Sequence, residues 1–137
     1  MMRWRLLVAE AALLLLAARL LVASLQLRWW RRWLGPMAAG PGTALANDGD
    51  RRLARAVERA ARRLPGNSKC LPQAMALHWM LARRSRPAQL VIAVLPGAVR
   101  GGLDDLHAWV ECGAEILIGA LDQPFRPLVR FGSASGH

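Results

Sequence analysis

Two residues of this chain, Cys70 and His107, could together form a thiol nucleophile and its base. Cys70 opens a stretch that predicts a helix, and His107 opens residues 107–111 (HAWVE), which predict a strand. A cysteine becomes a nucleophile only when a base or a positive environment converts it to the thiolate. At a helix start, unpaired N–H groups and the helix dipole favour that negative charge, although a small buried side chain is the alternative reading. Because a histidine is available as well, the pair indicates a thiol enzyme.

Neither of the other two histidines can serve Cys70 as a base. His78 lies eight residues further along the same predicted helix. That is about 12 Å along the axis, too far for proton transfer. His137 is the last residue of the sequence. Cys112 falls on the opposite side of its predicted strand from His107, since side chains alternate along a strand, and we expect it to be structural. Two cysteines make no disulfide framework and no zinc-type spacing occurs, so we expect neither a metal nor a cofactor.

The group that orients the imidazole of His107 is left open by the sequence. A hairpin turn after this strand places Ala120 opposite His107, or Gly119 after a shift of one residue, and neither can hold a proton. Asp122 lies just beyond and Asp105 just before, each within a diagonal neighbour distance of about 7–8 Å. Asp122 is therefore the predicted third member, with Asp105 as the alternative.

Two groups at the start of the predicted helix are candidates for stabilising an oxyanion. They are the side chain of Gln73 and the backbone N–H of Cys70, because amides at a helix start point toward the place where the tetrahedral oxygen forms. For Gln73, an ordinary exposed side chain of the first turn is the alternative.

The elements that must position these residues are two helices followed by a meander of strands. Apolar residues recur at helical spacing over residues 51–64, with Asp48 or Asp50 as the cap. A second helix is predicted over residues 70–84, and strands are predicted over residues 89–95, 107–112 and 115–119. The last two strands are joined by a turn at residues 113–114. This order predicts an α+β fold in which the nucleophile helix packs on a small antiparallel sheet.

An apolar segment precedes this core. Residues 6–27 are apolar except for four polar positions, among them Glu10 and Arg19. These two charges interrupt the run that a transmembrane helix needs, and they lie half a turn out of phase, so the predicted helix has no single polar face. We expect it to dock on the core or on a partner protein. Contact with a membrane interface is the alternative, since residues 28–33 (RWWRRW) combine arginine with tryptophan.

Glycine and proline mark the boundary between this segment and the core. Residues 35–43 and 47–50 have the composition of loops. The chain of 137 residues therefore divides into an apolar, Trp/Arg-rich N-terminal helix (1–34), a linker (35–50) and a core domain (51–137).

The charge balance narrows the choice of partners. Nineteen basic and nine acidic residues give a net charge of +10, which suits nucleic acid, lipid headgroups or an acidic peptide. The arginines are spread over two helices and no nucleic-acid motif is present, so we expect no nucleic-acid binding. Cysteine usage predicts a reduced, cytoplasmic compartment, with peripheral contact with the inner membrane through residues 1–34 left open.

The segments around both reactive residues resemble one family. Residues 68–71 (SKCL), 74–77, 87–92 and 107–111 are similar to the nucleophile helix and strands of the stand-alone transglutaminase-like leader peptidases of lasso-peptide biosynthesis, the microcin J-type maturation B family. The apolar N-terminus that ends in residues 33–35 (WLG) continues the resemblance. It implies a transglutaminase-like, papain-like fold and a cysteine peptidase that removes the leader from a ribosomally made precursor. It also implies three partners: the precursor peptide, a separate winged-helix protein that recognises the leader, and the cyclase that closes the lasso ring.

One position departs from this family. The family carries an aspartate twelve residues after the histidine, where this chain has Gly119. Either Asp122 or Asp105 replaces it, or Cys70 and His107 act as a dyad. Two other hypotheses stay open: a scaffold of the maturation complex with a vestigial site, and a membrane-bound basic protein without chemistry.

Overall fold

The computed structural model of the chain describes residues 4–24, 37–38, 45–64, 70–84, 86–94, 106–113, 115–119 and 126–132. The helices are α1 (Trp4–Ser24), α3 (Asp48–Arg63) and α4 (Cys70–Arg83). The strands are β1 (Met37–Ala38), β2 (Gln89–Val94), β3 (Leu106–Cys112), β4 (Glu115–Ile118) and β5 (Arg126–Gly132). Both helices and all three strands predicted for the core are therefore confirmed, each within a few residues of its predicted bounds.

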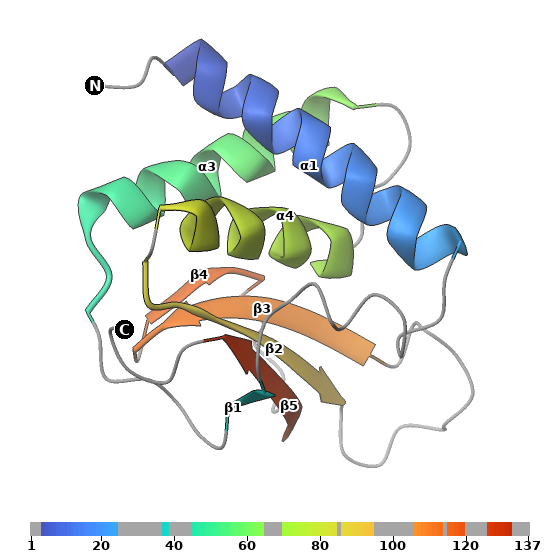
Figure 1. Cartoon of the computed structure of the whole chain (residues 1–137), viewed down its shortest axis with the longest axis vertical. Helices are drawn as coiled ribbons and strands as arrows, with labels where there is room; N and C mark the ends of the chain where they lie inside the picture. The colour runs from blue at the N-terminus through green and yellow to red at the C-terminus, as the bar shows by residue number, and fades with distance from the viewer. Residues whose placement is uncertain are drawn as a thin grey trace.

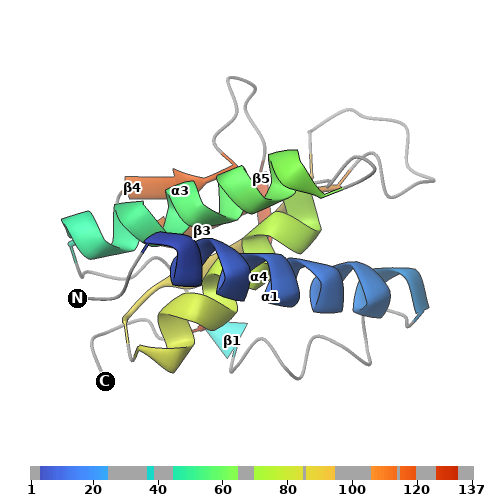
Figure 2. The same cartoon turned by 90° about the horizontal axis from the view of Figure 1, so that it is seen from above.

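The described elements form three layers (Figures 1 and 2). An antiparallel sheet of five strands, in the order β1-β5-β2-β3-β4, forms one layer. Helices α3 and α4 lie on one face of this sheet, and α1 lies across both helices on the outside. The α+β fold, with the helix that begins at Cys70 packed on an antiparallel sheet, is thus the observed architecture.

Two strands were not predicted. Residues 37–38 form β1 inside the stretch expected to be a loop, and residues 126–132 form β5, which pairs with both β1 and β2. The pairing partner of β1 lies about 90 residues away in sequence. Such a long-range contact leaves no local pattern in a two-residue segment. The composition of residues 35–43, which is typical of a loop, therefore gave no sign of a strand at residues 37–38.

The start of α3 corrects one detail of the sequence analysis. Its N-cap is Asn47, not Asp48 or Asp50: the Asn47 side chain accepts a hydrogen bond from the Asp50 N–H at 2.8 Å. The Asp50 carboxylate accepts in return from the Asn47 N–H at 3.0 Å, which completes a capping box. The helix begins three residues before the predicted bound. Its first turn is stabilised by the cap and contains no apolar residue, so the apolar spacing could not indicate it.

Helix α1 docks on the core, as the sequence analysis expected. One side of it is buried, and its members are Leu7, Ala11, Leu15 and Ala18. Glu10 is a charged residue within the apolar helix. Its carboxylate accepts hydrogen bonds from two nitrogens of Arg84 at 2.9 and 2.8 Å and forms an ion pair with Arg83 at 2.8 Å. The Glu10 carboxylate therefore links α1 to α4, and its pairing with two arginines explains why a charged residue occurs in this apolar helix.

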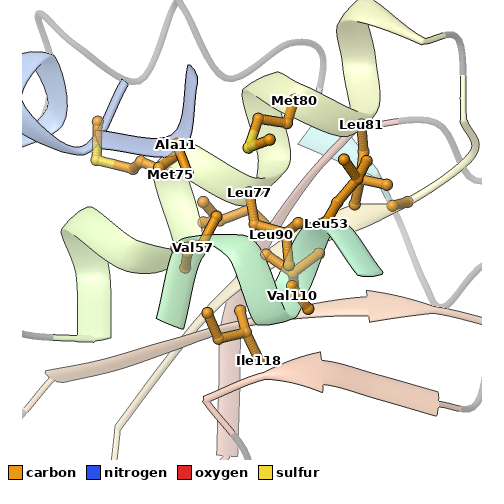
Figure 3. Close-up of a cluster of buried hydrophobic side chains, with 14 of the residues drawn as sticks. Ala11, Leu53, Val57, Met75, Leu77, Met80, Leu81, Leu90, Val110 and Ile118 are labelled. Atoms are coloured by element: carbon orange, nitrogen blue, oxygen red, sulfur yellow. The ribbon is translucent and has the colours of Figure 1, made fainter. Parts of the chain in front are cut away.

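The hydrophobic core fills the space between the helices and the sheet (Figure 3). Val57 of α3 and Leu77 of α4 are fully buried and meet Leu90 and Val110 of the central strands. Ala11 of α1 belongs to the same cluster, so the core runs continuously through all three layers. None of the described helices is long and apolar enough to cross a membrane.

Candidate active site

Cys70 is the first residue of α4, as predicted. The backbone there is helical, with Pro72 in the first turn, where its missing N–H costs no hydrogen bond. The Cys70 side chain lies outside what the structure describes. The half-buried Gln73 stands one turn further along α4, so its assignment as an oxyanion donor stays a prediction.

His107 is the second residue of β3 and is paired with Ala93 of β2. Its side chain is half-buried. Pairing between β2 and β3 is regular from Leu106 to Glu111, so side chains alternate strictly between the two faces of the sheet. His107 therefore shares a face with Trp109, as the sequence predicted.

Helix α4 and strand β3 begin at the same end of the fold. Only five residues separate the end of α4 from Gln89, which pairs with Glu111 near the end of β3. Helix α4 packs against β3 (Figure 1), and both elements are about 20 Å long. The start of α4, with Cys70, is thus directed toward the start of β3, with His107.

The two faces of the sheet have different surroundings at this point. Ala108 and Val110 belong to the core that α3 and α4 cover, whereas Trp109 packs with Val91 and Ala93 in a second cluster on the other face. His107 belongs to this second face by its pairing with Ala93. His107 therefore lies on the face of the sheet that α3 and α4 do not cover, whereas Cys70 is the first residue of α4.

Neither predicted third member, Asp105 or Asp122, lies among the described residues. Gly119, which stands where the leader peptidases that this chain resembles carry an aspartate, is described. It has a φ of +87°, and a Cβ built there would lie 2.6 Å from the Ala108 carbonyl oxygen and 3.0 Å from the Trp109 Cβ. This backbone is suited to glycine, so no aspartate fits here without a change of backbone.

The hairpin register also differs from the prediction. The predicted tight connection between β3 and β4 is confirmed, since Cys112 pairs with Glu115. A bulge then shifts the register, so that Val110 pairs with Ile118. Gly119 consequently lies beside Trp109 and not opposite His107, which corrects the expectation for that residue.

A polar network that the sequence did not reveal lies on the same face as His107. The Trp109 indole N–H donates to the Glu111 carboxylate at 2.7 Å. Arg130 of β5 donates to the other oxygen of Glu111 at 2.6 Å and to the Gln89 side-chain oxygen at 3.3 Å. The HAWVE segment is therefore held in place by an arginine from β5, a strand whose presence no sequence pattern had indicated.

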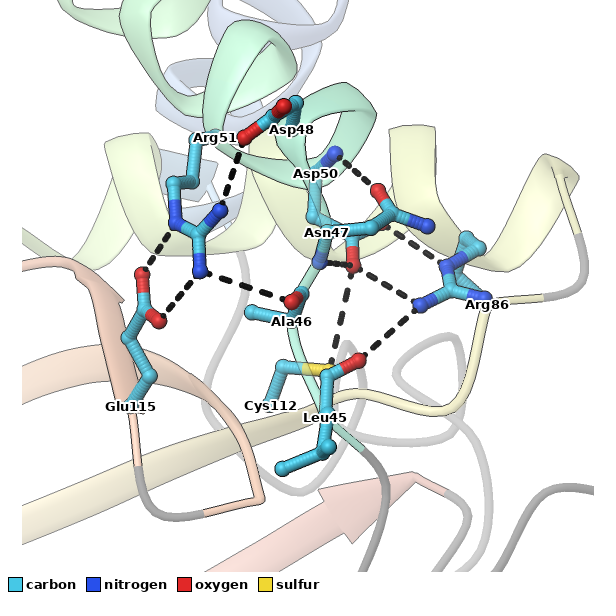
Figure 4. A network of polar contacts seen from close by, with 9 residues as sticks. All are labelled: Leu45, Ala46, Asn47, Asp48, Asp50, Arg51, Arg86, Cys112 and Glu115. Carbon is cyan, nitrogen blue, oxygen red and sulfur yellow. Dashed lines mark hydrogen bonds and ion pairs between the residues drawn. The ribbon is translucent and has the colours of Figure 1, made fainter.

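A second network lies at the opposite end of β3 (Figure 4). The buried Asp50 carboxylate accepts hydrogen bonds from Arg86 at 2.8 and 2.9 Å. The Cys112 thiol lies 3.5 Å from the Pro87 carbonyl oxygen and 3.9 Å from Asp50. Burial raises the pKa of Cys112, and the neighbouring Asp50 carboxylate acts in the same direction. Cys112 is a buried free thiol, which agrees with its predicted structural role.

No group of three or more metal-ligating side chains is found in the described ranges. Cys70 at the start of α4 and His107 near the start of β3 are the candidate nucleophile and base, and the structure describes the elements that carry them.

Sequence comparison gives the family of the chain. The profile of the transglutaminase-like superfamily matches residues 12–130, so the chain belongs to the transglutaminase-like superfamily. Domains of this superfamily are typically cysteine proteases or transglutaminases. Searches of curated proteins and of solved structures gave no match.

Proposed function

We propose that the protein is a cysteine endopeptidase that removes the leader peptide from a ribosomally synthesised lasso-peptide precursor. The observation that carries the proposal is the placement of Cys70 at the start of α4 and of His107 at the start of β3, at one end of a transglutaminase-like fold. The resemblance of residues 68–71 and 107–111 to lasso-peptide leader peptidases supplies the substrate class.

In this proposal Cys70 is the nucleophile and His107 carries the proton. The Cys70 sulfur attacks the carbonyl carbon at the cut site, and His107 takes the thiol proton. The C–N bond then breaks, His107 protonates the leaving amine, and the leader remains bound as a thioester. Water attacks this thioester with His107 as base, which releases the leader carboxylate and restores the thiol.

Asp122 is the proposed orienting group for His107, and Asp105 is the alternative. Asp105 lies two residues before His107, and Asp122 lies just beyond the return strand. At residue 119, in contrast, a Cβ would already lie 2.6 Å from the Ala108 carbonyl oxygen. An orienting carboxylate fixes the imidazole tautomer and can be worth orders of magnitude in rate. Gln73 and the Cys70 N–H are the proposed oxyanion donors.

The proposed partners follow from the resemblance. They are the precursor peptide, a winged-helix protein that presents the leader, and the cyclase that consumes the freed core peptide. We propose that cleavage takes place in the cytoplasm, before ring closure.

The experiment that tests the proposal is mass spectrometry of the cognate precursor after incubation with this protein and the leader-binding partner. Wild type, Cys70→Ala and Asp122→Asn are compared, with Asp48→Asn as a matched control at an exposed carboxylate. We expect a leader fragment with wild type and with Asp48→Asn, and none with Cys70→Ala. Slower cleavage with Asp122→Asn assigns Asp122 as the residue that orients His107. An unchanged cleavage rate assigns that role to Asp105 or indicates a Cys70–His107 dyad.

A scaffold with a vestigial site is the second candidate, and the glycine geometry at residue 119 favours it. In that case the precursor stays intact in every reaction although the partner binds the leader. Amide transfer is a variant of the first candidate, because it uses the same thioester with an amine in place of water. A primary amine added to the reaction separates the two, since it is incorporated only in transfer.

A further inference from the structure

Helix α1 presents a second apolar side, opposite the one that is buried. Every exposed residue from Leu6 to Leu20 is leucine or alanine: Leu6, Ala9, Leu13, Leu16, Ala17 and Leu20. The leucines are 59, 69, 42 and 67% exposed in chain order. This outer stripe faces away from α3 and α4, because those helices contact the side that contains Leu7 and Leu15.

Basic side chains lie beside the outer stripe. Arg5 is exposed at its start, and the guanidinium of Arg52 on α3 lies 5.8 Å from the centre of the Trp4 ring. Arg59 and Arg63 follow Arg52 at spacings of seven and eleven residues, which puts all three on the same side of α3. Both later arginines are exposed. Helices α1 and α3 pack together and lie side by side (Figure 2), and Arg52 lies against Trp4, so this side of α3 is the one next to α1.

We infer that the outer stripe of α1 docks on an anionic lipid surface. The leucines enter the boundary between headgroups and acyl chains, and the arginines of α3 bind lipid phosphates. The helix lies in the plane of the interface, with Trp4 at headgroup level. This inference is independent of the proposed peptidase activity.

Size and charge favour a lipid surface over a protein as the occupant. The stripe is about 22 Å long and about 10 Å wide, an area on the order of 200 Å². A stable protein interface buries about 800 Å² on each partner, so the stripe alone is too small for one. A second copy of the chain is opposed by the net charge of +10 on each molecule. An anionic membrane, in contrast, adds electrostatic attraction to a small apolar area.

The test is flotation of the full chain with vesicles of phosphatidylglycerol and phosphatidylcholine, and with vesicles of phosphatidylcholine alone. We expect the protein to float with the anionic vesicles and to bind the neutral ones at least about tenfold more weakly. The variant Leu13→Gln/Leu16→Gln/Leu20→Gln should lower binding to anionic vesicles by about tenfold or more, because it removes the buried alkyl groups. Arg59→Gln/Arg63→Gln should lower it as well and reduce its dependence on salt.

Matched controls separate docking from misfolding. Leu45→Gln changes a leucine that is 83% exposed outside α1, and it should leave binding unchanged. Circular dichroism of each variant checks that the helices persist. Wild type that remains unbound on anionic vesicles, or a triple leucine variant that binds like wild type, overturns the inference; in the first case an acidic partner helix becomes the occupant to test.

Discussion

The guanidinium of Arg86 holds the buried carboxylate of Asp50 through two hydrogen bonds, from Nε to Oδ1 at 2.8 Å and from Nη2 to Oδ2 at 2.9 Å. Asp50 is only 1% exposed, and the same carboxylate closes the capping box of α3. Arg86 stands in the short connection between α4 and β2. One ion pair therefore joins the start of α3 to the segment that follows α4.

Breaking this pair should destabilise the fold strongly. Arg86→Met leaves a buried carboxylate without its cation, and we expect a loss of about 3–5 kcal/mol in the free energy of unfolding. Urea denaturation followed by circular dichroism measures it. Arg55→Met, at an exposed arginine of α3, is the control and should change stability by less than about 0.5 kcal/mol. Equal effects of the two substitutions would contradict a structural role for the pair.

The link between α1 and α4 predicts a pH dependence of stability. The hydrogen bonds from Arg84 hold the pKa of Glu10 below its ordinary value of 4.5, against the opposing effect of burial, and the charges of Arg84 and Arg83 add to the lowering. A carboxyl with a lowered pKa in the folded state stabilises the fold above the unfolded pKa and loses that contribution as pH falls through the folded one.

Stability should therefore decline as pH falls below about 4.5, and Glu10→Gln should remove part of this decline. At neutral pH we expect the substitution to cost about 1–3 kcal/mol, since it weakens charge-assisted hydrogen bonds. Denaturation curves measured across this pH range test it. Glu58→Gln, at an exposed glutamate of α3, is the control and should leave the pH profile as in wild type.

Placing an aspartate at residue 119, as in the leader peptidases that this chain resembles, should not produce a triad. Gly119 has a φ of +87°, and a Cβ there would approach the Ala108 oxygen to 2.6 Å. We expect Gly119→Asp to lower stability by about 1–3 kcal/mol and to leave precursor cleavage no faster. Gly119→Ala should show a similar loss, which separates backbone strain from charge. An increase in cleavage rate with Gly119→Asp would show that the backbone adapts and that a triad can be rebuilt there.

Local patterns predicted most of the fold. Apolar spacing identified α3, α4, β2, β3 and β4, and the glycine at residue 113 marked the hairpin turn, where its φ is 61°. The pairings of β1 and β5 are long-range, and residues 37–38 are too few to carry a pattern. The bulge at Val110 arises from pairing between two strands, so the sequence of one strand could not indicate it.

The elements that carry Cys70 and His107 were predicted from the sequence, whereas the catalytic roles of these residues stay predictions. Helix position and strand alternation placed Cys70, His107 and the shared face of Trp109 and Glu111 correctly in their elements. Arg130, which binds Glu111, was missed because it comes from β5, and the Asp50–Arg86 pair was missed because its members are 36 residues apart. The sequence offered two indications of that pair: Asp50 is an acidic residue in the first turn of a helix, and Arg86 is an arginine just before a strand.

The two cysteines should differ sharply in reactivity. Burial raises the pKa of Cys112, and its side chain is 1% exposed, so it should stay unmodified by iodoacetamide in the folded protein at pH 8. Unfolding in urea should expose it to rapid modification. Peptide mapping by mass spectrometry distinguishes the two sites. Modification of Cys112 at equal rates in folded and unfolded protein would contradict its buried position.

The most direct test of the account is the pH dependence of Cys70 alkylation in wild type and in His107→Ala, because it needs neither precursor nor partner. Rates are measured by peptide mapping from about pH 5 to pH 9, with circular dichroism to confirm folding of the variant. We predict an apparent pKa for Cys70 well below the free-thiol value of about 8.5, and a rise toward that value when His107 is replaced. A profile that His107→Ala leaves unchanged would contradict the pairing of Cys70 with His107.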